Sequence, residues 1–279
     1  MERPERPVIG FLTDFGLDGA AATCRGVMLG ICRDAQIVDI SHTVRKFAIR
    51  DGGYLLRSSL PYLPIGVHVG IVDPGVGTER RPIALQVARG DILVGPDNGL
   101  LIPAAESLGG IEAARVLENR AYWLPVTSST FHGRDVFAPA AAHLAARTAR
   151  FDDLGGVLPI ADLVRLDAPH ARVTPGALET IVTYVDSFGN LRLAGGRDEL
   201  TAAIGDLEPN APVTIEFGAD AGGAQRESAR FATAFGEVDA GSALLYVDSS
   251  GRLAFADNQG DAALRLGVGT ERATRITRG

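Results

Sequence analysis

The sequence predicts two domains of different classes: an α/β N-terminal domain with a mostly parallel sheet, and an all-β C-terminal barrel domain. Short apolar runs alternate with segments of helical apolar spacing in the first half, as in α/β folds. The segment 163–175 interrupts this alternation with proline, glycine and other turn formers. Beyond it, short strand-like runs recur between turns, which is typical of small barrels and sandwiches. We therefore expect domains over residues 1–165 and 176–279.

The N-terminal elements follow from apolar spacing and from the residues that end each run. Strands are expected where short runs are continuously apolar, and helices where apolar residues recur three or four positions apart. Only residues 88–90 separate the expected strands 83–87 and 91–94, and this short gap predicts a hairpin. The expected strands are 8–12, 36–40, the run leading into Asp73, 83–87 and 91–94, and the expected helices are 20–32, 49–60, 100–108 and 135–150.

In the C-terminal domain, glycine, aspartate and serine separate short apolar runs that we expect to be strands. Two polar loops stand out, at 186–190 and 257–260, and each is either an ordinary turn or part of a site. The expected strands are 178–185, 212–217, 230–235, 243–247, 253–256 and 262–266.

Composition limits the function classes. Apolar residues make up 46% of the 279 residues, which is ample for a packed core. A net charge of -7 disfavours a nucleic-acid or membrane-surface role, because both need a basic patch. The charged, proline-rich start does not resemble a signal peptide and no run is long enough to span a bilayer, so we expect a cytoplasmic protein. Cys24 and Cys32 lie in one expected helix and are interpreted as free buried thiols.

Polar residues collect where the expected N-terminal strands end. Asp14, Asp73, Asp97 and Asn98 each follow a strand and stand beside glycine. In open α/β sheets, ligands bind at the carboxyl ends of the strands. Arg80 is near enough along the chain to fold back onto Asp73. These residues predict a site for a polar ligand at this edge of the sheet.

Several catalytic signatures are absent from the sequence. It has no P-loop, no dinucleotide-binding glycine motif after the first strand, no HExxH or paired-cysteine zinc pattern and no GxSxG elbow. Asp14, Asp18, Asp73 and Asp97 could bind a divalent cation, so a metal-dependent phosphohydrolase is a competing hypothesis. His132 lies in a loop just before a helix, where a histidine is either functional or simply exposed.

An ordered set of motifs resembles the S-adenosyl-L-methionine (SAM) hydroxide adenosyltransferase family, which comprises adenosine-forming SAM hydrolases related to the SAM-dependent fluorinase and chlorinase. The resemblance covers nearly the whole chain, and the order of the motifs is more specific than any one of them. The motifs are Thr13-Asp14-Phe15-Gly16, Asp73-Pro74-Gly75-Val76-Gly77 with Arg80, Gly95-Pro96-Asp97-Asn98-Gly99, Phe131-His132-Gly133-Arg134-Asp135, Asp186-Ser187-Phe188-Gly189-Asn190, and Ser249-Ser250-Gly251 with Asn258-Gln259-Gly260.

The resemblance implies a fold, an assembly and a reaction. It implies an α/β domain, a C-terminal β-barrel and a homotrimer in which SAM binds between the N-terminal domain of one subunit and the C-terminal domain of its neighbour. SAM would be the substrate, with no other cofactor and no metal. The hydrolytic branch of the family carries an Asp-Arg-His set that handles the attacking water, and the matching positions here are Asp73, Arg80 and His132.

The resemblance also implies substrate contacts. Asp14 matches the carboxylate that binds the ribose hydroxyls, and Asp186, Phe188 and Asn190 match the loop that holds the methionine end and the adenine. Further matches differ from the fluorinase in residue type. Phe47 stands where the fluorinase has a tryptophan near the substrate, and Asp257 and Ser250 stand where it has arginines, so binding by that last segment should differ in detail. Asn258 and Gln259 are its matching positions, and Asn258 is expected to bind substrate.

Two questions remain open at this point. Our hypothesis from the sequence is that Asp73 and Arg80 hold and polarise the water while neutral His132 accepts or relays its proton; the alternative is that His132 only lines the pocket and donates a hydrogen bond. The function itself has three candidates: a SAM hydrolase, a metal-dependent phosphohydrolase, and a protein that binds SAM or adenosine without turnover.

Overall fold

The structure, a computed structural model, describes residues 6–218 and 224–279. It divides into two compact units, Met1–Leu166 and Asp167–Gly279, and each is described by itself. In the described residues, no helix combines the length and the apolar character needed to cross a membrane.

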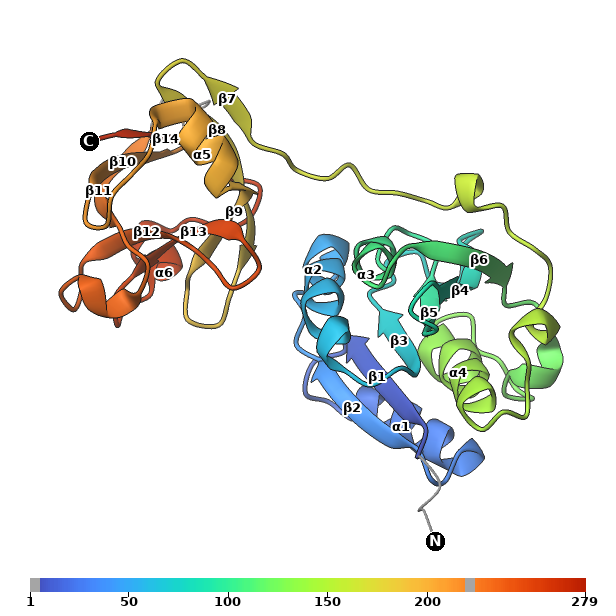
Figure 1. The fold of residues 1–279 in the computed structure, drawn as a ribbon. Helices are drawn as coiled ribbons and strands as arrows, with labels where there is room; N and C mark the ends of the chain where they lie inside the picture. The colour runs from blue at the N-terminus through green and yellow to red at the C-terminus, as the bar shows by residue number, and fades with distance from the viewer. Residues whose placement is uncertain (1–5, 219–223) are drawn as a thin grey trace, which may run out of the picture. The chain divides into compact units, whose positions relative to one another are not determined.

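The N-terminal unit is built on a mixed, mostly parallel sheet in the order β2-β1-β3-β5-β4-β6 (Figure 1). Neighbours among β2, β1, β3 and β5 are parallel, whereas β4 runs antiparallel to both β5 and β6. The predicted α/β class and the predicted hairpin are therefore confirmed. The strands are β1 (Val8–Thr13), β2 (Gln36–Ser41), β3 (Val67–Ile71), β4 (Pro82–Val87), β5 (Ile92–Pro96) and β6 (Ile111–Val116).

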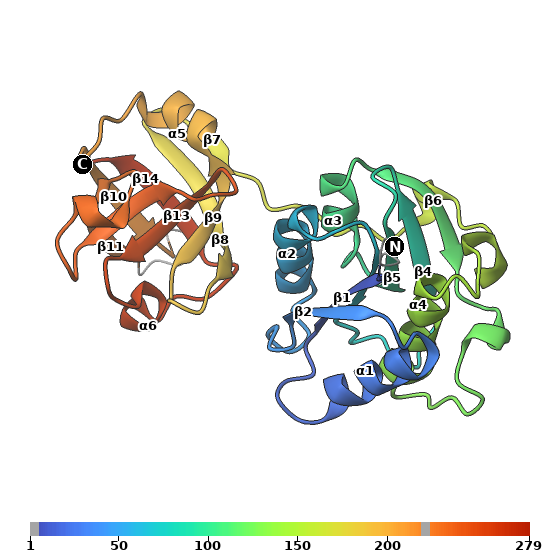
Figure 2. The ribbon, with the colours of Figure 1, turned by 60° about the horizontal axis from the view of Figure 1, so that its bottom comes forward.

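Helices cover both faces of this sheet (Figure 2). On one face, α1 (Ala20–Ile31) and α4 (Ala138–Ala145) pack over a cluster that includes Phe11 of β1. On the other, α2 (Ile49–Ser59) and α3 (Ile102–Ser107) pack over a cluster that includes Leu12. Because Phe11 and Leu12 enter clusters on opposite faces, the strand is buried at every position.

The structure corrects some N-terminal boundaries. The helix predicted over 135–150 begins as a π-helix, η3 (Gly133–Phe137), and α4 then ends at Ala145. β6 was not predicted, because the charged residues Glu112 and Arg115 interrupt its apolar run. Short 3₁₀ helices are η1 (Leu60–Tyr62), η2 (Arg120–Tyr122), η4 (Phe151–Leu154) and η5 (Ile160–Asp162).

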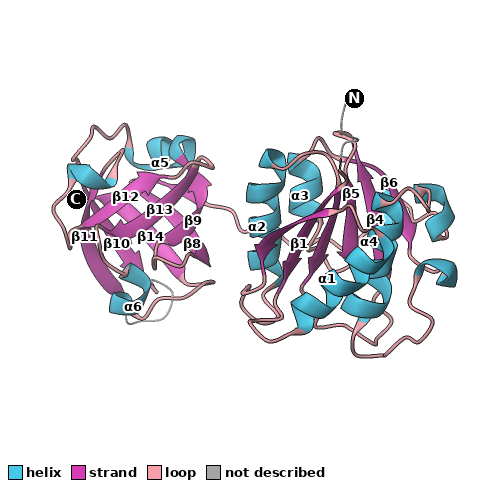
Figure 3. Ribbon diagram, turned by 90° about the horizontal axis from the view of Figure 1, so that it is seen from below, coloured by secondary structure: helices cyan, strands magenta, loops and turns pink. Residues whose placement is uncertain are grey.

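Seven strands of the C-terminal unit close into a barrel in the order β14-β10-β11-β12-β13-β9-β8, because β8 also pairs with β14 (Figure 3). The predicted all-β barrel is therefore confirmed, and β7 extends the sheet beyond β8. The elements are β7 (Arg172–Thr174), β8 (Ala177–Val185), β9 (Leu191–Gly196), α5 (Arg197–Ile204), β10 (Pro212–Phe217), β11 (Gln225–Phe231), η6 (Phe235–Glu237), β12 (Ala243–Val247), β13 (Arg252–Asp257), α6 (Ala262–Leu266) and β14 (Ala273–Arg278).

Two C-terminal strand predictions are wrong. Residues 262–266 form the helix α6, which is capped by Asp261 because its side chain accepts a hydrogen bond from the Leu264 amide. Ala262 and Leu266 are both buried, so the apolar residues follow helical spacing. The strand expected at 230–235 lies earlier, as β11, whose alternating polar residues hide it from a search for apolar runs.

Cys24 and Cys32 are free and buried, as predicted. Burial raises the pKa of Cys24 to about 12, so this thiol is unreactive at neutral pH.

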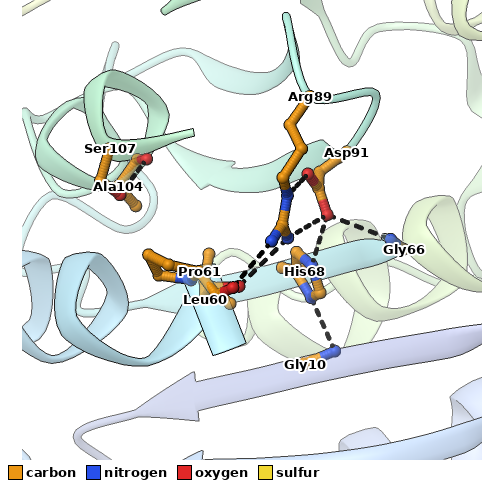
Figure 4. Close-up of polar contacts among 9 residues, drawn as sticks. All are labelled: Gly10, Leu60, Pro61, Gly66, His68, Arg89, Asp91, Ala104 and Ser107. Carbon is orange, nitrogen blue, oxygen red and sulfur yellow. Dashed lines mark hydrogen bonds and ion pairs between the residues drawn. The ribbon is translucent and has the colours of Figure 1, made fainter. Parts of the chain in front are cut away.

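A largely buried polar network joins β1, β3 and the hairpin between β4 and β5 (Figure 4). The Gly10 amide donates to His68 Nδ1 at 3.1 Å, and His68 Nε2 contacts Asp91 Oδ1 at 3.0 Å. Arg89 donates to both Asp91 oxygens, and the Gly66 amide donates to Oδ1. Burial alone raises the pKa of Asp91, but the hydrogen bonds from His68, Arg89 and Gly66 lower it below its usual range. The network ties β1, β3 and the β4–β5 hairpin together.

Replacing Asp91 with alanine is expected to lower the free energy of unfolding by about 3–5 kcal/mol, because it removes the acceptor of the His68 and Gly66 donors and the carboxylate that pairs with Arg89. Urea denaturation measures this. Since the pKa of Asp91 is lowered by folding, its contribution is present above the unfolded value of about 3.9 and is lost as the pH falls below it. The matched control is Asp152→Ala, which breaks the exposed Arg115–Asp152 pair and should cost less than about 1 kcal/mol. Equal effects of the two variants would contradict a structural role for the network.

Candidate functional site

The carboxyl ends of β1, β3 and β5 lie side by side, because these strands are parallel neighbours in the sheet. Asp14 follows β1, Asp73 comes two residues after β3, and Asp97 directly follows β5. The predicted gathering of carboxylates at one edge is therefore present, although their partners differ.

Asp73 and Arg80 form a buried ion pair. Arg80 Nε donates to Asp73 Oδ1 at 3.0 Å, and Arg80 Nη2 donates to Oδ2. The side chains are 6% and 7% exposed. The intervening residues form tight turns, in which the Val76 amide donates to the Asp73 carbonyl and the Thr78 amide to that of Gly75. These turns bring Arg80 back onto Asp73, as the spacing predicted.

His132 completes this group from a distant part of the chain. It lies directly before η3, and its Nδ1 is 3.2 Å from Arg80 Nη2. The Arg80 guanidinium also lies over the ring of Phe137, 5.3 Å from its centroid. Within the described ranges, buried Arg80 Nη1 has no hydrogen-bond partner. Asp73, Arg80 and His132 thus form one cluster with a free donor.

The loops that carry the cluster also touch at a second point. A Cβ on Gly77 would lie 2.5 Å from the Ser129 carbonyl oxygen, so only glycine allows the 127–132 loop to pack this closely. Fully buried Asp135 holds that loop from the other side, because its carboxylate accepts from the Ser128 amide and pairs with Arg134. Asp135 is the last residue of the motif that begins at Phe131, and the sequence alone predicted no role for it.

The contact with Arg80 fixes the tautomer of His132. A guanidinium can only donate hydrogen bonds, so Nδ1 must accept and the proton of the neutral ring sits on Nε2. Burial and the neighbouring Arg80 charge lower the pKa of His132 below its usual value. The ring is therefore neutral at pH 7 and presents an N–H donor on its second nitrogen.

Asp14 has a different partner. Its Oδ2 accepts from the backbone amide of Phe47 at 2.9 Å. Phe47 has a φ of 66°, which is uncommon for a residue with a side chain, and its ring is 67% exposed. The carboxylate therefore holds a strained backbone that presents an aromatic ring to its surroundings.

Asp97 and Asn98 bind other loops. Asp97 accepts from Arg81 Nε and from the Val164 amide, both at 2.9 Å, and is almost fully buried. The side chain of Asn98 donates to the Val72 carbonyl at 2.8 Å. Both residues therefore stabilise this edge of the sheet.

In the C-terminal unit, the Asp186–Asn190 residues form one tight turn between β8 and β9. Asp186 Oδ1 accepts from the amides of Phe188 and Asn190, and Oδ2 accepts from the Asn190 side chain. The ring of Phe188 is 74% exposed, whereas Asn190 is buried. The turn thus projects one aromatic ring from a rigid base.

Asn258 lies in the next polar turn and is buried. Its side chain donates to the Val238 carbonyl at 2.7 Å. The two polar turns meet, because a Cβ on Gly189 would lie 1.9 Å from Asp261 Oδ1. The structure therefore brings the 186–190 turn next to the segment that contains Asn258.

The two positions that differ from the fluorinase have partners of their own. Asp257 accepts from Arg265 Nε and Nη2 at 2.7 and 2.8 Å. Ser250 donates from its amide and its hydroxyl to Asp248 Oδ1.

The described part of the chain contains no group of three or more His, Cys, Asp and Glu side chains arranged to hold a metal ion. Asp73 and Asp97 have arginine partners, and Asp14 is bound by a backbone amide. The edge of the sheet therefore carries carboxylates that protein donors already bind.

Comparison with known families identifies both halves of the chain. The model of the SAM hydroxide adenosyltransferase N-terminal domain matches residues 9–155, and that of the C-terminal domain matches residues 180–275. The chain belongs to this family. The family resemblance read from the motifs is therefore confirmed.

Two named relatives match this chain over nearly its full length. It is 42% identical over 274 residues to the (R)-S-adenosyl-L-methionine hydrolase of Salinispora tropica, with 98% of each chain covered. It is 30% identical to the fluorinase of Actinopolyspora mzabensis, again with 98% of each chain covered. A solved structure of an uncharacterized conserved protein from Thermotoga maritima matches with a TM-score of 0.85 and 34% identity, covering 97% of this chain and 100% of the other.

Proposed function

We propose that this protein hydrolyses SAM to adenosine and L-methionine. The observation that carries the proposal is the buried cluster of Asp73, Arg80 and His132, in a chain whose full-length relative is named an (R)-SAM hydrolase. No cofactor besides the substrate is part of the proposal.

Hydrolysis of SAM depends mainly on activation of the attacking water. The sulfonium of SAM leaves as the neutral thioether of methionine, so the leaving group needs no general acid. Water is a poor nucleophile, so it must lie in line with the ribose C5′ and lose a proton. A carboxylate, a guanidinium and an imidazole around one water meet both needs.

The tautomer of His132 assigns roles within the cluster. With its proton on Nε2, His132 donates a hydrogen bond to the water and orients it, and it has no free lone pair for the water's proton. Asp73 takes the proton, since each carboxylate oxygen has a further acceptor site besides its bond to Arg80. Of the two roles left open for His132, we therefore propose hydrogen-bond donation.

Substrate contacts complete the proposal. Asp14 accepts hydrogen bonds from the ribose hydroxyls, and Phe47 lies near the substrate. Asp186, Phe188 and Asn190 hold the methionine end and the adenine, with Asn258 as a further contact. The exposure of both aromatic rings supports this, since Phe47 and Phe188 each offer an uncovered apolar face.

Turnover of SAM by the purified protein tests the function. Chromatography should show adenosine and methionine forming in equal amounts, and a chelator such as EDTA should leave the rate unchanged. Loss of activity with the chelator would favour the metal-dependent phosphohydrolase. Binding of SAM without products would favour a sensor.

We further propose a homotrimer that acts in the cytoplasm, where SAM is made and used. Each site would take its N-terminal half from one subunit and its C-terminal half from the neighbour. Head-to-tail contacts of this kind close into a ring. In support, the proposed site residues occur in both compact units of the chain.

Shared sites predict complementation between two inactive variants. Asp73→Ala damages the N-terminal half of a site, and Asn190→Ala damages the C-terminal half. The two variants are mixed, their subunits are dissociated, and the subunits are allowed to reassemble. The mixture should regain activity, because some sites then combine two intact halves. Activity of the mixture against each variant alone measures this, and absence of recovery despite demonstrated subunit exchange would contradict shared sites.

A further inference from the structure

The barrel contains two turns of the same design, at 186–190 and 248–252. Their sequences are Asp-Ser-Phe-Gly-Asn and Asp-Ser-Ser-Gly-Arg. In each, Oδ1 of the aspartate accepts from the amides two and four residues later. Each glycine amide donates to the carbonyl of the aspartate, with φ of 79° and 78°. Oδ2 of each aspartate has other partners: that of Asp186 accepts from the Asn190 side chain, and that of Asp248 pairs with Arg192.

Arg192 lies between Oδ2 of Asp186 and Oδ2 of Asp248. Its Nη1 pairs with Asp248 Oδ2, and its Nη2 is 3.9 Å from Asp186 Oδ2. Asp248 is only 4% exposed, so the pair is anchored at that end. At the other end, 3.9 Å is ion-pair distance but longer than a hydrogen bond, so Arg192 holds Asp186 Oδ2 electrostatically. Oδ2 also accepts from the Asn190 side chain, and its second lone pair can accept from a ligand.

The strand register explains why one arginine reaches both turns. β9 lies between β8 and β13, and β12 is the other neighbour of β13 (Figure 3). Arg192 of β9 is paired with Tyr184 of β8 on one side and with Ala254 of β13 on the other. Ala254 is in turn paired with Tyr246 of β12. Asp186 comes two residues after Tyr184, and Asp248 comes two residues after Tyr246, so each aspartate is on the same face of the sheet as its tyrosine. β8 and β12 run in opposite directions, so the two turns lie on opposite sides of Arg192.

We propose that Arg192 is a positioning residue for substrate binding, which holds the Asp186 turn in place by linking it to the buried side chain of Asp248. The inference rests on the proposed function, in which the Asp186 turn holds the methionine end of SAM. A guanidinium suits this role because its planar fork addresses two carboxylates in a fixed geometry, whereas an ammonium is a point charge on a flexible stem. Arg192 itself need not touch the substrate.

Steady-state kinetics of Arg192→Met, Arg192→Lys and Asp248→Asn test the proposal. Each should raise KM for SAM by about tenfold or more, because the loss of a charge-assisted contact loosens the turn. Each should leave kcat close to that of the wild type, since the Asp73 cluster is intact. The double variant Arg192→Met/Asp248→Asn should raise KM no further than the worse single variant, because both act through one link. The matched control is Arg172→Met, which breaks an exposed pair with Glu179 in the same unit.

The split between KM and kcat separates positioning from a merely structural role. A structural role would lower the fraction of folded enzyme, and with it the apparent kcat, without changing KM. If Arg192→Met fails to fold, Arg192→Lys and Asp248→Asn carry the test. Folded variants with the KM of the wild type, or with a lower kcat at unchanged KM, would overturn the proposal. Failure of the wild type to convert SAM would instead overturn the proposed function, and a calorimetric Kd for SAM would then replace KM in the same comparison.

Discussion

Replacing Asp73 with asparagine is expected to lower kcat by about 10²–10⁴-fold, the usual contribution of a positioned general base. Asparagine has nearly the same shape but cannot take a proton from the attacking water. It also leaves the buried Arg80 charge without a counter-ion, so the guanidinium loses the contact that orients it. Rates under saturating SAM, with folding checked by circular dichroism, measure the effect.

The neighbouring pair of Asp97 and Arg81 supplies a matched control. It is also an aspartate–arginine pair at the edge of the same sheet, but Asp97 binds the loop amide of Val164 and has no place in the proposed reaction. Asp97→Asn should therefore lower stability while leaving kcat close to that of the wild type, at temperatures where the variant is folded. Similar losses of kcat in both variants would show that Asp73 acts through stability alone.

Two substitutions of His132 should differ strongly in activity. Asparagine can accept from Arg80 through its oxygen and donate to the water through its nitrogen, so His132→Asn should keep kcat within about tenfold of the wild type. Phenylalanine can do neither, so His132→Phe should lose about 10²-fold or more, as when an oriented donor is removed from an active site. If His132 is instead the base, both variants should be equally inactive.

The pH profile tests the same assignment. Burial and Arg80 lower the pKa of His132, so the neutral ring is retained below the usual value of about 6.5. Protonation at lower pH puts a proton on Nδ1, facing the Arg80 donor, and breaks their contact. Activity of the wild type should therefore fall only below pH 6.5, and this acid limb should be absent from His132→Asn. An unchanged limb in that variant would assign the titration to another group.

The sequence predicted the fold where periodicity was strong. β1 and α1 were predicted because the strand begins as a short apolar run, buried throughout, and the helix has regular apolar spacing. β11 was misplaced because polar residues alternate along it and hide it from a search for apolar runs. α6 was taken for a strand because a mostly apolar five-residue segment fits both periods, and only the Asp261 cap decides between them.

The site was predicted only in part. Arg80 and Asp73 are seven residues apart, so a turn signal was enough to place them together. His132 is 52 residues from Arg80, and no local pattern in one sequence encodes such a contact, so it came from the family resemblance. The tautomer of His132 and the link through Arg192 depend on side-chain geometry, which the sequence does not contain.

The most direct test of the proposed reaction follows the oxygen atom of the attacking water. Purified protein is incubated with SAM in oxygen-18 water with chloride present, and the nucleoside product is analysed by mass spectrometry. Attack of an activated water on C5′ predicts adenosine with the label at its 5′ oxygen, together with unlabelled methionine. Formation of 5′-chloro-5′-deoxyadenosine as the main product, or of adenosine without the label, would contradict the proposed mechanism.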